Sequence, residues 1–478
     1  MFDKDWRSPM YQIDFSKPIH VHFIGIGGIS MSGLAELLHN RGFTITGSDA
    51  KESKTTEHLN RIGIQVKIGQ CAQNIVKDID LVVYTAAIHP DNEEYNAVIA
   101  AKIPMIDRAE LLGQVMKQYK SAISIAGTHG KTTTTSMVSL MMLEGNLDPT
   151  ISVGGILNNI EGNIRIGNSH HFIVESCEYM NSFLSFEPTH AIILNIDADH
   201  LDFFKDLNEI RHSFRLFSKK LPKSGNLVIN GSIEHYEEIT KDLDCNIITY
   251  GVLPASFCLG VDSSPYDYAA CNITYDEFGF GAFDLIHNNQ LITRMKLSVV
   301  GEHNISNAVS SIALVDQMGV SYEVMQTALL KYKGTKRRFE YKGEFHGVKI
   351  VDDYAHHPTE IKATLEAAAS YPHKNLWCVF QPHTYTRTKA LFKDFITALS
   401  LADNVVLADI YAAREADPGD ISAEDIQKEL VNLGKTAYYF DSFKKIEKFL
   451  IENCTNGDLL ITMGAGDIVS IGEYLLSL

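Results

Sequence analysis

Residues 127–133, GTHGKTT, have the composition of a loop that binds phosphate. Gly127 and Gly130 allow the backbone to curl around a phosphate group. Lys131 supplies a cation for the β- and γ-phosphate oxygens, and Thr132 offers a hydroxyl group to Mg²⁺. The stretch therefore predicts a nucleotide site, and the competing interpretation is a threonine-rich helix cap with a solvated lysine.

The spacing of this loop differs from the common phosphate-loop pattern, which has glycine, four residues and then Gly-Lys-Ser/Thr. Ile125 stands where that pattern has its first glycine. The residue types of a phosphate loop are thus present, and only its usual length is lacking.

Acidic side chains follow two apolar runs downstream of the loop. The run 170–175 ends on Glu175, and the run 191–196 is followed by Asp197, Asp199, His200 and Asp202. Open α/β sheets bind ligands at the carboxyl ends of their strands. Mg²⁺ prefers oxygen ligands and keeps several waters, so one or two such groups suffice. For His200 alone, a structural role is the simpler interpretation.

A second glycine turn, GIGGISMSG at residues 25–33, follows an apolar run and opens a helical pattern. Backbone N–H groups in such a turn close on a pyrophosphate at the helix N-terminus. Asp49 ends the next apolar run, where an acid contacts a ribose or a base. The turn predicts a dinucleotide or another nucleotide diphosphate, with a structural glycine turn as the alternative. Its candidate ligands are Gly25, Gly27, Gly28, Ser30 and Asp49.

Paired amides and paired guanidinium groups follow later in the chain. Asn304 and Asn307 lie three residues apart, on one face of an opening helix. They could read a base edge, although spacing alone favours helix capping. Arg337 and Arg338 are either solvated or reach across a cleft to phosphate.

Two polar loops, VDDYAHHPTE and FQPHTYTRT, each follow an apolar run, so both are expected to project from one edge of a sheet. They carry Asp352, Asp353, Tyr354, His356, His357, His383 and Arg387. Metal binding by the adjacent histidines is an open alternative, but rings at i and i+1 do not share a helix face. Cys177 is interpreted as a packed thiol because no base is paired with it.

The elements that position these groups alternate between strand and helix from residue 20 onward, which indicates parallel sheets with helical crossovers. The alternation restarts near residue 120 and again near 334. Because 478 residues exceed one hydrophobic core, we expect an α/β protein with domains 1–119, 120–333 and 334–478. Residues 255–286 resemble a β-meander instead.

The composition narrows the class of protein. Asp and Glu number 59 against 42 Lys and Arg, which gives a net charge of −17 and excludes a broad nucleic-acid interface. Seven dispersed cysteines indicate reduced thiols. Neither a signal peptide nor an apolar run of membrane-spanning length is evident. These features predict a soluble cytoplasmic protein.

Taken in order, these stretches resemble the motifs of the Mur ligase family, the ATP-dependent amide-forming enzymes of bacterial peptidoglycan synthesis. The resemblance runs over essentially the whole chain and rests on HFIGIGGISMSG, AGTHGKTTT, ESCEYMNSFL, NIDADHLD, GEHNISNA, GTKRRFE, DDYAHHPTE and FQPHTYTRT. The family uses a shorter phosphate loop, which accounts for Ile125. The motif at 175–184 has Ser176 where alanine is usual.

The resemblance implies an N-terminal Rossmann-like domain for a UDP-sugar, a central P-loop ATPase-like mixed sheet and a C-terminal Rossmann-like α/β domain. FQPHTYTRT favours the branch that adds L-alanine to UDP-N-acetylmuramate over the branch that recycles a murein tripeptide. ATP, Mg²⁺ and these small-molecule substrates are the implied ligands, with no nucleic acid or membrane partner, in a monomer or dimer.

The resemblance also implies roles for individual residues. ATP is expected to contact Gly127, Thr128, His129, Gly130, Lys131, Thr132, Thr133, Asn304, Asn307, Arg338 and Asp353. The catalytic set is Lys131, Glu175, His200 and Arg338, and the metal ligands are Thr132, Glu175 and His200. The amino-acid pocket is expected to comprise Tyr354, His356, His383 and Arg387.

Two alternative functions, from other classes of protein, remain open. An NAD-dependent oxidoreductase would rest on the turn at 25–33 and Asp49 alone, and would leave the phosphate loop unexplained. A nucleotide-dependent switch protein would hydrolyse ATP slowly without needing an amino acid.

Overall fold

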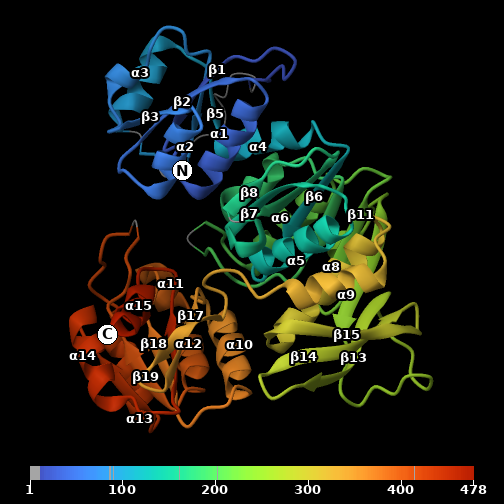
Figure 1. Ribbon diagram of the computed structural model, residues 1–478, viewed down its shortest axis with the longest axis vertical. Helices are drawn as coiled ribbons and strands as arrows, with labels where there is room; N and C mark the ends of the chain where they lie inside the picture. Colours follow the sequence, from blue (N-terminus) through green and yellow to red (C-terminus); the bar gives the residue numbers. More distant parts are fainter. Residues whose placement is uncertain (1–10, 86–87, 90, 161, 202, 414) are drawn as a thin grey trace.

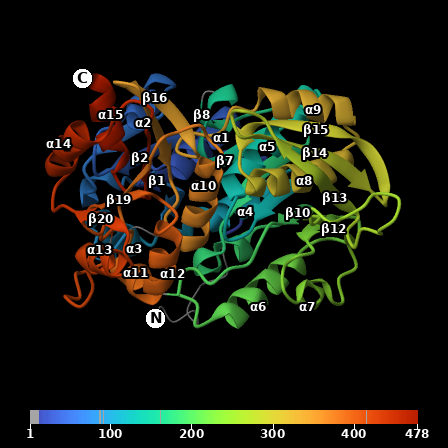
Figure 2. The same cartoon turned by 90° about the horizontal axis from the view of Figure 1, so that it is seen from below.

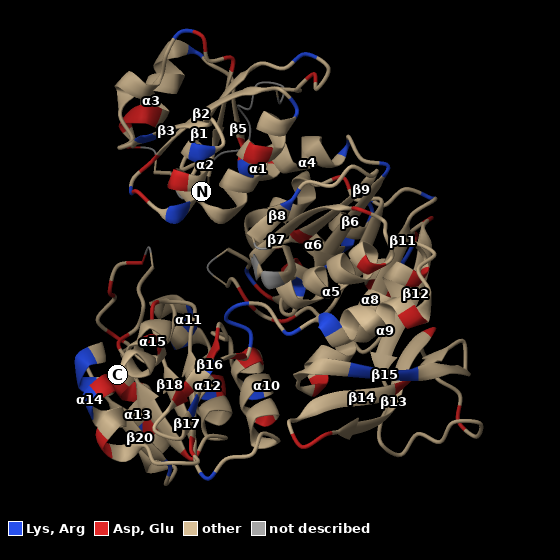
Figure 3. Ribbon diagram, viewed as in Figure 1, with Lys and Arg blue, Asp and Glu red and all other residues tan. Residues whose placement is uncertain are grey.

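The computed structural model describes residues 11–85, 88–89, 91–160, 162–201, 203–413 and 415–478, and it contains three β-sheets that follow one another along the chain (Figure 1). We name the parts built on them the N-terminal unit (20–116), the central unit (121–331) and the C-terminal unit (340–477). Lys and Arg are scattered along the elements of all three units (Figure 3). Within the described residues, helices long and apolar enough to cross a membrane are absent.

The N-terminal unit has a parallel sheet of order β3-β2-β1-β4-β5. Its strands are β1 (His20–Ile24), β2 (Thr44–Asp49), β3 (Gln65–Ile68), β4 (Leu81–Tyr84) and β5 (Met105–Asp107). Its helices are α1 (Ile29–Asn40), α2 (Lys54–Arg61), η2 (Ala72–Asn74), α3 (Glu93–Ala101) and α4 (Arg108–Met116). The strand order reverses between β1 and β4, so the glycine turn after β1 lies at the crevice where such sheets bind ligands.

The central unit has a mixed sheet of order β15-β14-β13-β12-β11-β10-β6-β9-β7-β8. The strands are β6 (Ser121–Ala126), β7 (Thr150–Leu157), β8 (Gly162–Arg165), β9 (His171–Ser176), β10 (His190–Ile193), β11 (Asn226–Asn230), β12 (Asn246–Val252), β13 (Tyr268–Tyr275), β14 (Phe280–His287) and β15 (Gln290–Val300). The helices are α5 (Lys131–Glu144), η3 (Asn158–Ile160), η4 (Tyr179–Ser185), α6 (Leu207–Ser218), α7 (Tyr236–Thr240), α8 (Glu302–Asp316) and α9 (Tyr322–Lys331). The predicted meander is confirmed: β13, β14 and β15 pair antiparallel.

The C-terminal unit has a sheet of order β16-β17-β21-β18-β19-β20, in which β16 is antiparallel to its neighbour. The strands are β16 (Glu340–Phe345), β17 (Val348–Asp353), β18 (Leu376–Phe380), β19 (Asn404–Leu407), β20 (Thr436–Tyr439) and β21 (Leu459–Met463). The helices are α10 (Pro358–Ala369), α11 (Tyr385–Ala390), α12 (Phe392–Leu399), α13 (Ala423–Asn432), α14 (Phe443–Asn453) and α15 (Val469–Ser477). The expected α/β class with three successive sheets is therefore confirmed.

The units meet at two different kinds of seam. The N-terminal and central units share one apolar core, in which α4 packs against η4; Leu112 and Phe183 are both fully buried there. The C-terminal unit meets the central unit through α10, which lies between the two sheets (Figure 2) and contacts α8. Its own apolar clusters draw on residues 339–476. Polar and ionic contacts that cross this second seam form the candidate site.

Candidate functional site

The phosphate loop joins the buried central strand β6 to helix α5. Gly127 and Gly130 have φ values of +143° and +81°, which favour glycine. A Cβ on Gly130 would lie 2.8 Å from the Asn307 side-chain oxygen, so the close approach of α8 requires glycine here as well. The segment after β10 braces the loop: the His129 amide donates to Asn195 Oδ1 at 2.7 Å, and the Asp197 amide donates to Thr128 Oγ1 at 2.9 Å.

Lys131 begins α5, and its ammonium group is almost completely enclosed. Its Nζ donates to the carbonyl oxygens of Gly127 and Thr128 and forms an ion pair with Glu178 Oε2 at 3.1 Å. Burial lowers the pKa of Lys131, but the Glu178 carboxylate outweighs that effect and the pKa is raised. The cation predicted for phosphate is thus held within the loop by a carboxylate.

Oxygen ligands suited to Mg²⁺ gather beside this lysine. Thr132 Oγ1 donates to Glu175 Oε2 at 2.9 Å, and Glu175 ends β9 next to β6. His200 has a positive φ of 55°, and its Nε2 lies 3.9 Å from Glu178 Oε1. That Glu178 oxygen is buried and lacks a hydrogen-bond partner among the described residues. Carboxylate and hydroxyl oxygens are the ligands that Mg²⁺ prefers, although the described part of the chain holds no cluster of three or more His, Cys, Asp or Glu side chains placed to bind a metal ion.

Glu178 was missed as a candidate from the sequence, although it is the second acid of the motif at 175–184. It is 2% exposed and contacts both Lys131 and His200. The neighbouring Cys177 is a packed thiol, as predicted, and burial raises its pKa to about 11. Asp202 lies outside the residues that the structure describes.

The paired amides occupy the first turns of α8 and face the phosphate loop. Asn307 Nδ2 donates to Asn304 Oδ1 at 3.2 Å, which confirms that both lie on one helix face, and both are buried. Beside them a cavity of about 550 Å³ opens between the start of α8 and α10, with Gly301, His303 and Ser306 in its wall. Burial lowers the pKa of His303 to about 4, so this ring is neutral at pH 7, while Glu302 and Glu366 also line the cavity.

The two polar loops of the C-terminal unit project from the same sheet edge, as predicted, because β17 and β18 both run parallel to β21. Arg338 lies over the Tyr354 ring at 5.4 Å and 3.8 Å from Glu360. Asp353 accepts hydrogen bonds from the amides of Phe339 and Ala355, and burial raises its pKa to about 6.

The residues expected to form the amino-acid pocket do come together. The His356 ring lies 5.6 Å from the Tyr354 ring and 5.9 Å from the His383 ring. Arg387 Nη1 contacts His383 Nδ1 at 3.2 Å, while Nε and Nη2 donate to Asp199 Oδ1 of the central unit at 3.1 and 3.0 Å. The guanidinium group of this pocket is therefore held by a carboxylate from across the seam.

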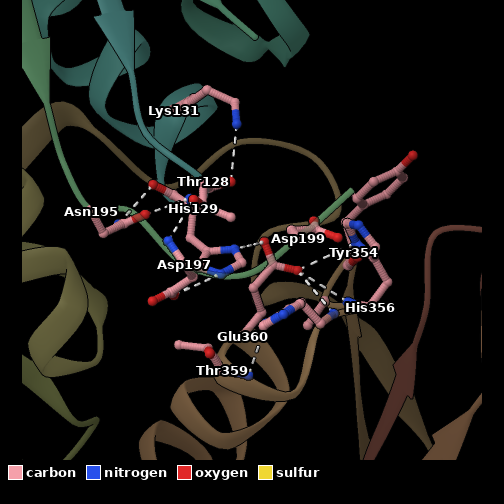
Figure 4. A network of polar contacts seen from close by, with 12 residues as sticks. Thr128, His129, Lys131, Asn195, Asp197, Asp199, Tyr354, His356, Thr359 and Glu360 are labelled. Atoms are coloured by element: carbon pink, nitrogen blue, oxygen red, sulfur yellow. Dashed lines mark hydrogen bonds and ion pairs between the residues drawn. The ribbon is translucent and has the colours of Figure 1, made fainter. Parts of the chain in front are cut away.

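His129 occupies the centre of the same seam, between two carboxylates (Figure 4). Its Nε2 lies 3.0 Å from Asp197 Oδ2, and its Nδ1 lies 3.1 Å from Glu360 Oε1 of α10. Burial alone lowers the pKa of this imidazole, but the two carboxylates outweigh burial and raise the pKa to about 9. His129 is consequently a cation at neutral pH.

This arrangement predicts a loss of stability at alkaline pH. A folded-state pKa of about 9, above the ordinary histidine value of 6.5, stabilises the folded protein fully below pH 6.5, and that stabilisation is lost as the pH rises through 9. We expect the thermal unfolding temperature to fall between pH 6.5 and 9.5, and to fall less in the His129→Gln variant, whose side chain cannot titrate. If the unfolding temperature fell equally with pH in the two proteins, the ion pairs of His129 with Asp197 and Glu360 would be contradicted.

The glycine turn after β1 is held by Asp49, whose Oδ2 accepts a hydrogen bond from the Gly27 amide at 2.8 Å. Arg108, at the start of α4, donates to Ser30 Oγ at 3.1 Å. Burial lowers the pKa of Arg108. This partly buried cation beside the turn could not be predicted, because Arg108 is distant along the chain and belongs to no glycine motif.

The comparisons with known proteins cover nearly the whole chain. Sequence profiles match "Mur ligase family, catalytic domain" at residues 20–120, "Mur ligase middle domain" at 125–315 and "Mur ligase, glutamate ligase domain" at 337–466. The UDP-N-acetylmuramate--L-alanine ligase of Lachnoclostridium phytofermentans is 67% identical over 98% of this chain and 100% of its own. That of Lachnospira eligens is 56% identical over the same shares.

Solved structures agree with this grouping. The UDP-N-acetylmuramate-alanine ligase MurC of Thermotoga maritima superposes with a TM-score of 0.79 at 28% identity, over 96% of this chain and 98% of its own. A murein peptide ligase of Psychrobacter arcticus shares the fold, with a TM-score of 0.69 at 24% identity over 96% and 98% of the two chains. The chain belongs to the Mur ligase family.

Proposed function

We propose that this Mur ligase joins L-alanine to the carboxylate of UDP-N-acetylmuramate in peptidoglycan precursor synthesis, while ATP is converted to ADP and phosphate. The observation that carries the proposal is the meeting of the phosphate loop with both polar C-terminal loops across one seam. His129 contacts Glu360 at 3.1 Å there, and Asp199 contacts Arg387 at 3.0 Å. The 67% identical L-alanine ligase supports the choice of amino acid.

In the first step, an oxygen of the muramyl carboxylate attacks the γ-phosphorus of ATP. The bond from that phosphorus to the bridging oxygen breaks, and ADP leaves. Because two anions must approach each other, cations have to surround the transferring group. Lys131 leaves its ion pair with Glu178 and pairs with the γ-phosphate instead. Arg338 adds a second positive charge from the C-terminal unit.

Mg²⁺, when bound, neutralises charge on the β- and γ-phosphate oxygens. Thr132 and Glu175 would be its ligands, and His200 would lie beside a second ion. Gly127, Thr128, Gly130 and Thr133 cradle the phosphates, while Asn304 and Asn307 face the adenine and Asp353 the ribose.

In the second step, the amine nitrogen of L-alanine attacks the acyl carbon, the carbon–oxygen bond to phosphate breaks, and the departing phosphate takes up the proton that the amine loses. Burial lowers the pKa of His356 to about 4 and keeps that ring neutral, so Arg387 is the cation for the alanine carboxylate. Tyr354 and His383 complete the pocket. Closing the C-terminal unit over the loop excludes water from the acyl phosphate.

The three domains 1–119, 120–333 and 334–478 take the UDP-sugar, ATP and the amino acid in that order. Gly25, Gly27, Gly28, Ser30 and Asp49, together with the partly buried Arg108, receive the diphosphate of the sugar nucleotide. The protein acts in the cytoplasm as a monomer or dimer.

The test is ADP release with Mg²⁺, ATP and UDP-N-acetylmuramate, with L-alanine or a murein tripeptide added separately and the product mass read on the same samples. We expect turnover with L-alanine only, and a product heavier by one alanyl unit. Turnover with the tripeptide only would assign the chain to the recycling branch. ATP binding without turnover in either sample would refute the ligase assignment.

A further inference from the structure

Glu360 is the acidic residue at the start of α10, and its carboxylate contacts residues from three parts of the candidate site. Oε1 lies 3.1 Å from His129 Nδ1 and 3.8 Å from Arg338 Nη1. Oε2 accepts the His356 amide at 3.1 Å and lies 3.3 Å from His356 Nδ1. The side chain is 12% exposed, so these contacts are made largely out of water.

The backbone at this helix end fixes where the carboxylate stands. Glu360 is the third residue of α10, and its Oε2 also contacts the His357 amide at 3.4 Å, which completes a capping box with His357. The His357 ring in turn lies 4.8 Å from the His129 ring and contacts the Ala198 carbonyl oxygen at 3.4 Å. The start of α10 is thus seated on the central unit as one piece.

On the opposite side, His129 is fixed to the central unit. Its amide donates to Asn195, and its Nε2 faces Asp197 at 3.0 Å. Because Asn195 and Asp197 hold His129 in place, a shift of Glu360 would change its contact with a phosphate loop that is itself fixed to the central unit. The same shift acts on His356, whose ring belongs to the proposed amino-acid pocket (Figure 4).

We propose that Glu360 is a positioning residue that couples the phosphate loop to the amino-acid pocket. By binding His129 and His356 with its two oxygens, it orders the pocket for L-alanine only when the C-terminal unit is docked on the phosphate loop. This inference rests on the proposed ligase function. Its consequence is that the acyl phosphate forms where the amine of L-alanine, which will accept the acyl group, is already oriented and water is excluded.

The experiment compares wild-type protein with Glu360→Gln, His129→Ala, the double variant and Glu344→Gln. Glu344 is an exposed acid on β16, so its replacement is a matched control for the loss of one carboxylate from the C-terminal unit. ADP and the alanylated product are measured on the same samples while L-alanine and UDP-N-acetylmuramate are varied in turn. Thermal unfolding of each protein checks that it is folded.

For Glu360→Gln we expect the KM for L-alanine to rise about tenfold or more, while the KM for UDP-N-acetylmuramate stays within about twofold. ADP release should exceed product formation, because misplaced alanine lets water hydrolyse the acyl phosphate. The double variant should be no worse than the poorer single variant, because both changes break the same link. Glu344→Gln should match wild type.

Equal rises in KM for both substrates, tight coupling of ADP to product, or additive effects in the double variant would overturn the positioning role. If Glu360→Gln does not fold, the same measurements are made on Glu360→Asp. This variant keeps the charge and the helix cap but shortens the reach of the carboxylate. If wild-type protein makes no alanylated product, the ligase function itself fails, and the inference fails with it.

Discussion

Replacing Lys131 with Met should lower the rate of ADP release by at least roughly 10²–10³-fold, the loss that follows removal of one electrostatic group from a transition state. Methionine keeps the length and the apolar stem but removes the charge that meets the transferring phosphoryl group. The rate is measured by ADP release at saturating ATP, L-alanine and UDP-N-acetylmuramate. A variant that retained more than a tenth of the wild-type rate would refute the role of Lys131.

The same substitution should also destabilise the protein, because it leaves the Glu178 carboxylate buried without its ion pair. Breaking a buried pair from one side costs about 3–5 kcal/mol. The double variant Lys131→Met/Glu178→Gln removes both charges, so it should recover most of the unfolding temperature but none of the activity. Recovery of activity together with stability would show that Lys131 is only structural.

Replacing Gly113 with Ala should separate the N-terminal unit from the central unit. A Cβ at this position of α4 would lie 1.9 Å from the backbone oxygen of Ser185 in η4. Alanine favours helix by about 1 kcal/mol over glycine, but a backbone oxygen cannot rotate away, so α4 must move. A displacement of about 1 Å between the sugar site and the phosphate loop is expected to lower kcat/KM on the order of 10²-fold.

The measurement is kcat/KM for UDP-N-acetylmuramate, together with the unfolding temperature. Gly472→Ala in α15 is the control, because the nearest atom to its Cβ is a side-chain methyl of Ile350 at 3.0 Å. We expect the control to stay within about twofold of wild type in activity. Wild-type kcat/KM in Gly113→Ala would mean that the seam tolerates the shift and that the two sites are not rigidly linked.

The fold could be predicted largely because its local patterns agree with its sheets. The buried strands β6, β9 and β10 are short apolar runs, each with a glycine or an acid at or soon after its end, and the helix after the phosphate loop is capped by Gly145. The order of the strands could not be predicted. Placing β21, the last strand, between β17 and β18 depends on packing between distant segments.

The candidate site was predictable where its residues share a motif and hidden where they meet only in space. The phosphate loop, Glu175 and the two C-terminal loops all carry local signals. Glu178 and Glu360 lie within the motifs at 175–184 and 351–360, but an acid in a helix cap has an ordinary local explanation. Arg108, at a helix start, belongs to none of these motifs. Their importance appears only in contacts with Lys131, His129 and Ser30.

The two seams of this molecule also differ in how they respond to dissolved ions. The Debye length shortens from about 10 Å at 0.1 M salt to about 3 Å at 1 M, which screens the partly exposed Arg338–Glu360 pair more than the buried His129–Glu360 pair. The seam beside Leu112 and Phe183 is largely apolar, with the exposed Lys117–Glu187 pair at its edge, and sulfate or phosphate salts strengthen its apolar part. High ionic strength should therefore loosen the C-terminal unit slightly relative to the other two units, whose apolar seam it strengthens.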